Sequence, residues 1–130
     1  MAASYATALR NAELDAITTF VGNAGQLIIY DGTPPANAGA ALSGNNALVT
    51  FTCASPFASA SSAAVLSPTL PSATAASLSG TASFFRQYKS DGTTVAFQGA
   101  VGSELTLDTT SIVSGGLVTI TAYSVTRGNP

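Results

Sequence analysis

The stretch RQYKSDGTTVAFQG, residues 86–99, gives the clearest indication of the fold. Its two halves alternate apolar and polar residues and are rich in residues that favour strands. Asp91 and Gly92 between them accept the positive φ angles that a tight hairpin turn needs. The stretch therefore predicts two neighbouring antiparallel strands.

Period-two runs of Val, Ile, Thr, Phe and Tyr continue on both sides of this hairpin, separated by Gly, Pro, Ser and Asn. Gly115 and Gly116 predict a second turn, followed by a long strand with a bulge. We predict about eight short strands, at residues 26–31, 47–53, 63–66, 73–78, 81–89, 93–98, 104–107 and 117–126. Such a series is typical of an antiparallel β-sandwich or jelly roll.

Before residue 22 the apolar spacing changes to three and four, which predicts one N-terminal α-helix from residue 4 to residue 21. Ser4 is the expected N-cap, and the GNAG segment at 22–25 is the expected end. We expect this helix to pack on the sheet through an apolar stripe made by Tyr5, Leu9, Ala12, Ala16 and Phe20 and widened by Leu14, Ile17 and Val21. The length fits a single domain, with the helix and its cap at 1–25 and the β-sandwich at 26–130.

The segment LIIYDGTPPANAG, residues 27–39, places one acid at the junction of a strand and a turn. Asp31 could be a catalytic acid, but its carboxylate more simply accepts the amides of Gly32 and Thr33 in an Asx turn. Pro34 and Pro35 then give the turn a rigid, extended exit. We therefore assign Asp31, like Asp91, a structural role.

The composition argues against several classes of function. Only 8% of the residues are charged, with four basic and six acidic side chains and no His. This excludes the basic patch that nucleic acid requires, and a catalytic base or a set of metal ligands is hard to assemble. Cys53 lies between apolar residues and is expected to be structural. We predict no enzyme activity, no metal, no cofactor and no membrane span, because no apolar run is long enough.

Three long stretches carry a resemblance to a known class of proteins. Residues 11–42, 80–102 and 105–128, with the motifs IYDGTPPA, GTA and SDG, resemble small structural proteins from tailed-bacteriophage and prophage morphogenesis clusters. Some of these proteins look like capsid cement or decoration proteins. The resemblance implies a protein made in the host cytoplasm that binds the capsid exterior and bridges major capsid protein subunits. It carries over no catalytic residues.

Two alternatives remain at this point. A phage tail or baseplate component would have a similar composition, and a carbohydrate-binding module for host recognition would need exposed aromatics such as Tyr30 or Tyr88. We also expect a dimer or trimer on the particle, because the long strand at 117–126 and the apolar helix offer surface for self-association. The candidate interface residues are Tyr5, Leu9, Arg10, Arg86, Lys89 and Arg127.

Overall fold

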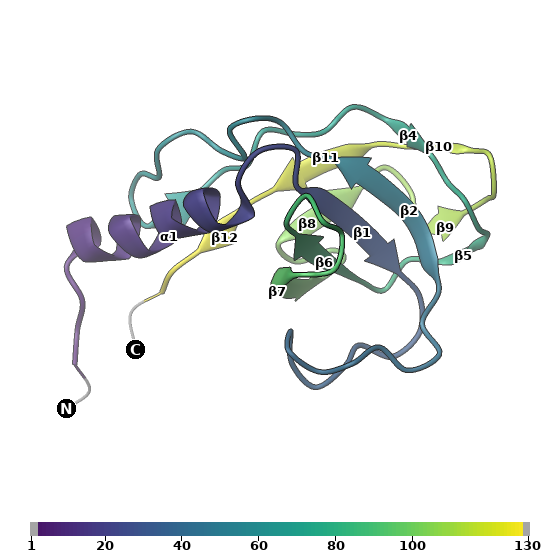
Figure 1. The fold of residues 1–130 in the computed structure, drawn as a ribbon, viewed down its shortest axis with the longest axis horizontal. Helices are drawn as coiled ribbons and strands as arrows, with labels where there is room; N and C mark the ends of the chain where they lie inside the picture. The colour runs from purple at the N-terminus through teal and green to yellow at the C-terminus, as the bar shows by residue number, and fades with distance from the viewer. Residues whose placement is uncertain (1–2, 129–130) are drawn as a thin grey trace.

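The computed structural model describes residues 3–128, and the fold is mainly β with one helix at its N-terminal end (Figure 1). Helix α1 (Thr7–Val21) forms one end of the molecule, and antiparallel pairs of strands form the body beside it. The predicted order of one helix followed by many short strands is confirmed.

Helix α1 begins later than the sequence predicts. Its N-cap residue is Ala6, which has an extended backbone and no capping side chain, so the prediction of Ser4 as the cap is wrong. The helix ends at Gly22, whose φ is 72° and whose amide donates to the Thr18 carbonyl oxygen at 3.1 Å. Because glycine adopts a positive φ at little cost, the GNAG segment ends the helix where the sequence predicts.

A four-stranded antiparallel sheet forms the centre of the body. Its order is β2 (Ala47–Thr52), β1 (Gln26–Tyr30), β6 (Phe84–Tyr88) and β7 (Val95–Ala100). Strands β6 and β7 are the predicted hairpin. Asp91 Oδ1 accepts the amides of Thr93 and Thr94 at 2.9 Å each, and Gly92 has a φ of 71°. The turn therefore uses the two residues that the sequence singled out.

Among the described residues, the other strands form two-stranded antiparallel ladders. These ladders are β10 (Leu117–Val118) with β4 (Thr74–Ala75), β11 (Ile120–Tyr123) with β8 (Leu105–Leu107), β12 (Val125–Thr126) with β3 (Val65–Leu66), and β5 (Gly80–Thr81) with β9 (Ser111–Ile112). The turn before β10 forms as predicted, since the Gly116 amide donates to the Val113 carbonyl oxygen at 2.8 Å. Gly115 there has a φ of 82°.

The strand predicted at 117–126 is divided into β10, β11 and β12, which pair with three different partners. The strand is interrupted at Thr119 and Ser124. The Thr119 amide donates to Asp108 Oδ1 at 3.1 Å, and the Ser124 amide donates to the Glu104 carbonyl oxygen at 2.9 Å. A register shift between Ile120 and Ala122 confirms the predicted irregularity. The single long edge expected for self-association is therefore absent, and β9 was not predicted.

The main hydrophobic core lies between one face of the four-stranded sheet and the ladders. Leu27, Phe51 and Phe85 from the sheet pack in one cluster with Leu66 and Ile120 from the ladders. Burial of each large apolar side chain contributes roughly 1.5–3 kcal/mol relative to exposure. Cys53 is free and buried in this cluster, as its apolar flanks predict.

The opposite face of the four-stranded sheet is covered by residues 31–46, which we call the outer-face loop. Arg86 points from β6 toward this loop and is only 4% exposed. Its Nη2 donates to the Ala40 carbonyl oxygen at 2.5 Å and its Nε to Gln98 Oε1 at 2.9 Å. Gln98 Nε2 donates in turn to the Pro35 carbonyl oxygen at 3.0 Å. The loop is thus held down by an arginine whose acceptors are all neutral.

Asp31 closes the base of the outer-face loop. Its Oδ1 accepts the Asn46 amide at 2.7 Å and its Oδ2 accepts Asn46 Nδ2 at 3.1 Å. The predicted Asx turn with Gly32 and Thr33 is therefore wrong, because the carboxylate reaches the far end of the loop rather than the next residues. The hydrogen bond from the Asn46 amide lowers the pKa of Asp31, as expected for a stabilised carboxylate.

We expect Asp91 to make the fold sensitive to acid. Hydrogen bonds from the Thr94 side chain and from the Thr94 and Thr93 amides lower its pKa from 3.8 to about 2. Between about pH 4 and pH 2 the unfolded chain then binds more protons than the folded chain, so stability falls as the pH falls. Asp91→Asn keeps an acceptor oxygen but does not titrate, so its urea midpoint should decline less over this range. Parallel declines in both proteins would contradict this role.

Candidate functional site

Polar residues attach helix α1 to the body. Asn11 Oδ1 accepts the Ala64 amide at 2.9 Å, and Asp15 Oδ1 accepts the Ser61 amide at 2.8 Å. The Ser61 hydroxyl donates to the Asn11 carbonyl oxygen at 2.8 Å. Ala63 and Ala64 have φ angles of 52° and 60°, a conformation that is unfavourable for residues other than glycine. The two helix side chains therefore support an irregular segment that could not satisfy its own amides.

The same side of α1 carries the buried apolar residues. Leu14 is 2% exposed and Val21 is 1% exposed. Both belong to the main core, and Leu14 lies three positions along the helix from Asn11. The side of the helix that packs on the body is therefore a mixture of two apolar and two hydrogen-bonding side chains.

The predicted apolar stripe packs on the body only through Leu14, Val21 and Ile17, and its centre faces solvent. Leu9 is 49% exposed and Phe20 is 46% exposed, and Ala12 and Ala16 between them are also exposed. We call these four residues the helix stripe. Leu9 and Phe20 face outward because the amides of Ser61 and Ala64 need acceptors, and Asn11 and Asp15, which supply them, lie on a different part of the helix circumference.

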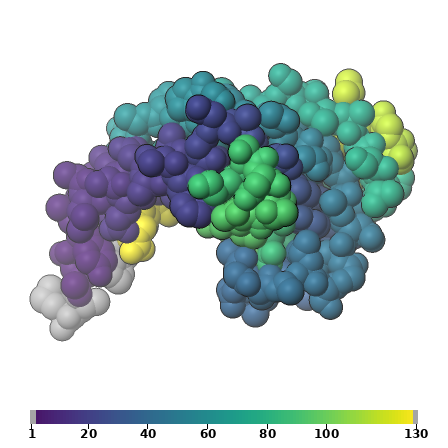
Figure 2. All heavy atoms as spheres, viewed as in Figure 1, coloured from purple at the N-terminus to yellow at the C-terminus, as the bar shows by residue number. Residues whose placement is uncertain are grey.

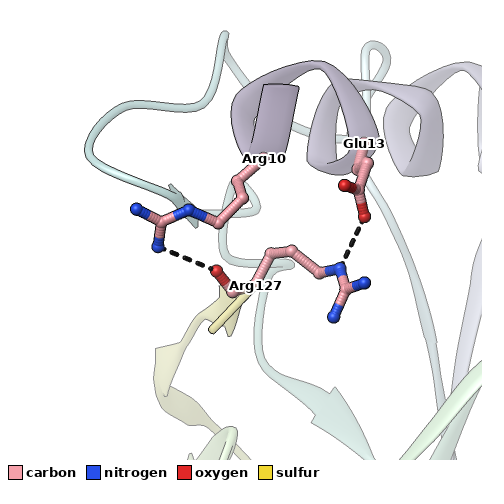
Figure 3. A network of polar contacts seen from close by, with 3 residues as sticks. All are labelled: Arg10, Glu13 and Arg127. Carbon is pink, nitrogen blue, oxygen red and sulfur yellow. Dashed lines mark hydrogen bonds and ion pairs between the residues drawn. The ribbon is translucent and has the colours of Figure 1, made fainter. Parts of the chain in front are cut away.

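Charged residues join the N-terminal half of α1 to the chain after β12 (Figure 3). Arg127 Nε lies 2.5 Å from Glu13 Oε2, and Arg10 Nη1 donates to the Arg127 carbonyl oxygen at 3.3 Å. The Arg127 guanidinium lies 5.9 Å from the centre of the Tyr5 ring. Glu13 raises the pKa of Arg127 through its hydrogen bond and its charge. These contacts are exposed and fix orientation more than they add stability.

The structure brings together most of the predicted interface residues. Tyr5, Leu9, Arg10 and Arg127 lie around the first half of α1. Lys89 lies at the other end of the helix, with its Nζ 4.8 Å from the centre of the Phe20 ring. Arg86 does not belong to this group. It is buried beneath the outer-face loop, which corrects the expectation that it contributes to an interface.

A shallow cavity adjoins the helix stripe. It has a volume of about 280 Å³ and lies between α1 and strand β7, with Ala16, Ile17, Phe20 and Ala96 among its lining residues. The helix stripe is therefore continuous with a concave apolar surface.

A second exposed apolar surface lies at the opposite end of the molecule, near β5, β9 and β10 (Figure 1). It consists of Leu78, Val113 and Leu117, which we call the distal patch; Leu117 is 67% exposed. A hydrogen bond connects the segment that contains Leu78 to the segment that contains Val113 and Leu117: the Ser114 amide donates to Ser79 Oγ at 2.9 Å. Sequence reasoning missed this patch, although apolar residues on either side of a glycine turn were a usable signal.

The structure places the side chains that metal binding, nucleophilic chemistry or sugar binding would use. Within residues 3–128, no group of three or more His, Cys, Asp or Glu side chains is placed to hold a metal ion. Burial raises the pKa of the Cys53 thiol, which disfavours a nucleophilic thiolate. Tyr30 and Tyr88 are buried and their hydroxyl oxygens lie 2.7 Å apart. They therefore do not form the exposed platform that a carbohydrate-binding module would need.

The described helix is too short and too polar to cross a membrane.

We expect the helix stripe to be dispensable for folding. Leu9→Gln should change the free energy of unfolding by no more than about 0.5 kcal/mol, since the site is exposed and Gln is a good helix former. Phe20→Gln should cost up to about 1 kcal/mol more through the lost contact with Lys89. Leu14→Ala, the buried control on the same helix, should cost about 2–5 kcal/mol. Urea unfolding measures all three, and a Leu9 effect as large as the Leu14 effect would contradict this assignment.

Comparisons with protein-family models, with curated proteins and with solved structures found no match to this chain. Its function is therefore inferred from the exposed surfaces of the fold together with the sequence.

Proposed function

We propose that the protein is a non-enzymatic structural component of a phage virion, a cement or decoration protein on the capsid exterior. In this proposal it binds the outer surface of the head and bridges neighbouring major capsid protein subunits. The observation that carries the proposal is the helix stripe. Four apolar or small residues face solvent on a helix that is already fixed to the body by its polar side. Such a surface fits contact with another protein.

The distal patch supports bridging rather than simple attachment. The helix stripe and the distal patch lie at opposite ends of the long axis of the molecule (Figure 1). A protein with one apolar surface at each end can contact two neighbours at once. Because the second contact is then intramolecular, two weak surfaces can give strong overall binding. A tail or baseplate component, the alternative that the sequence leaves open, gains no specific support from this geometry.

The proposal includes a finer description of the fold. The main core joins one face of the four-stranded sheet to the ladders, and the outer-face loop covers the other face. We interpret the sheet and the ladders as the two layers of a β-sandwich, the architecture that the resemblance implies. The expected dimer or trimer remains a separate prediction, to be tested by sedimentation.

We expect images of the particles with which the protein co-purifies to show it on heads. Leu9→Gln with Phe20→Gln should lower its occupancy on those particles several-fold, because burial of each large apolar side chain is worth roughly 1.5–3 kcal/mol. Leu78→Ser with Leu117→Thr should also lower occupancy, because the second contact is lost. Quantitative gel analysis of purified particles measures both effects.

Leu70→Gln serves as the matched control, since Leu70 is 45% exposed but belongs to neither surface. Its occupancy should equal that of the unmodified protein. Localisation on tails would refute the cement proposal and favour a tail component. Equal occupancy of all variants on heads would show that neither apolar surface is the attachment site.

We expect binding to the particle to be nearly independent of salt. The chain has ten ionisable charged side chains, and one of its four basic residues, Arg86, is buried. At physiological ionic strength the Debye length is about 8 Å, so exposed charge pairs weaken as salt rises whereas apolar contacts hold or tighten. Occupancy measured across a sodium chloride series should stay constant. Release at moderate salt would mean that Arg10, Lys89 or Arg127 carries the attachment.

A further inference from the structure

Strand β7 forms one edge of the four-stranded sheet, and β6 is its partner on the inner side. Just beyond β7, the Val101 amide donates to the Ser83 carbonyl oxygen at 3.1 Å and therefore points toward β6. Backbone groups alternate in direction along an extended strand, so the amides of Gln98 and Ala100 point away from β6. Ala100 is exposed and Gln98 is half-buried. The outer edge of β7 is thus accessible, and no strand within residues 3–128 pairs with it.

A cavity of about 450 Å³ opens along this edge, and we call it the edge groove. Phe97 and Gln98 both line it, although the side chains of successive strand residues point to opposite faces of a sheet. The cavity therefore lies at the edge itself rather than over one face. The chain at 124–126, which includes β12, also lines the groove. Its volume lies within the range typical of ligand sites, about 300–1,000 Å³.

Two walls limit what the edge groove can hold. Helix α1 contributes Ile17 to the lining, and on the other face of the sheet Gln98 Nε2 donates to the Pro35 carbonyl oxygen of the outer-face loop at 3.0 Å. Figure 2 shows the surface hollowed between α1 and this loop, beneath the β6–β7 hairpin. A second copy of the molecule cannot bring the edge of its own sheet into this recess, because its neighbouring strands would meet the walls. A single extended segment fits, since adjacent strands lie only about 4.8 Å apart.

The edge also lacks the features that usually prevent strand addition. Residues 95–100, VAFQGA, contain no charged residue and no Pro. A register shift opposite Gln87 and Tyr88 makes the start of β7 irregular. Beyond it, residues 97–100 keep a regular register with β6. The part of the edge that borders the groove is therefore regular, uncharged and suited to pairing.

We propose that β7 accepts an additional strand from another protein, supplied as a single extended and uncharged segment. The backbone groups of Gln98 and Ala100 pair with the backbone of that segment, which explains why the occupant is a strand rather than a helix or a small molecule. Its side chains on one face lie among Phe97, Ile17 and Val125 and are expected to be apolar. Those on the other face lie beside Gln98 and the outer-face loop and are expected to be small and polar.

The added strand is a contact separate from the helix stripe and does not depend on the location of the partner on a head. The two surfaces are nevertheless adjacent, since Ile17 lines both the edge groove and the smaller cavity beside the stripe. A partner that covers the stripe with a folded domain could therefore place a neighbouring extended segment on β7. Backbone hydrogen bonds and apolar contacts carry this interaction, so it agrees with weak salt dependence.

The test uses the capped peptide acetyl-Ser-Val-Thr-Val-Thr-Val-Ser-amide and amide NMR of the full chain. The peptide should give saturable shifts at Gln98 and Ala100 and should slow the hydrogen exchange of both amides. Two further peptides carry N-methyl groups, one on both Thr residues and the other on the first two Val residues. Because alternate amides of a strand point to the same side, one of these peptides should bind at least about tenfold more weakly and the other should bind like the parent.

A pair of variants tests the same edge from the side of the protein. Ala100→Pro removes an amide that points away from β6, a position where an edge strand tolerates Pro. It should weaken peptide binding by about tenfold or more. Ala100→Ser keeps the amide and should bind the peptide like the unmodified protein. The amide spectra of the two free variants report whether each is folded.

Several results would overturn the proposal. Equal binding by the two methylated peptides, or unchanged binding by a folded Ala100→Pro variant, would show that backbone pairing is not the mode of recognition. Shifts confined to Leu9 and Phe20 would place the peptide on the helix stripe instead. Slow exchange of the Gln98 and Ala100 amides without peptide, in a protein that sediments as a dimer, would show that a second copy covers the edge. If Ala100→Pro does not fold, the methylated peptides still decide, because they require no change in the protein.

Discussion

The backbone amides of Ser61 and Ala64 receive their acceptors from helix α1, and the arrangement of one whole end of the molecule depends on this. The segment around Ala63 and Ala64 has left-handed φ angles and no strand partner for these two amides. Leaving them unpaired when buried would cost about as much as losing two hydrogen bonds. Asp15 and Asn11 supply the acceptors only when the helix presents its polar side to the body. That requirement fixes the rotation of α1 about its own axis.

The rotation of α1 determines the surfaces around it. It turns Leu9 and Phe20 outward, and it places Ile17 at the edge of both cavities. It also brings Glu13 and Arg10 to Arg127, which anchors the chain after β12 against the helix. The outward position of the apolar stripe and the ion pair with Arg127 both follow this orientation of the helix.

The sequence predicted local features such as turns and strands well. It predicted poorly which side of the helix is buried. The hairpin at Asp91 and Gly92, the end of α1 at Gly22 and most strands of the main sheet follow from turn chemistry and periodicity, which act within a few residues. The outward position of the helix stripe depends on Ser61 and Ala64, about fifty residues away, and no local pattern encodes it. The predicted donors to Asp31 were also wrong, because its carboxylate accepts a hydrogen bond from the amide of Asn46 rather than from the amide of Gly32. The cavity of about 450 Å³ beside α1 forms from four separate segments of the chain, and no local pattern indicates it.

In the proposed bridging role, the path of the last segment has a mechanical consequence. From Leu117 in the distal patch to Arg127 beside α1, a single stretch of backbone runs along the length of the molecule through β10, β11 and β12 (Figure 1). At roughly 3.3 Å per residue, ten extended residues reach about 30 Å. If two neighbours pull on the two apolar ends, most of the tension passes along covalent bonds, and the ladders beside the segment need only keep it straight. The weakest part of this segment under tension would be its attachment to the helix, where Arg127 contacts Glu13 and Arg10.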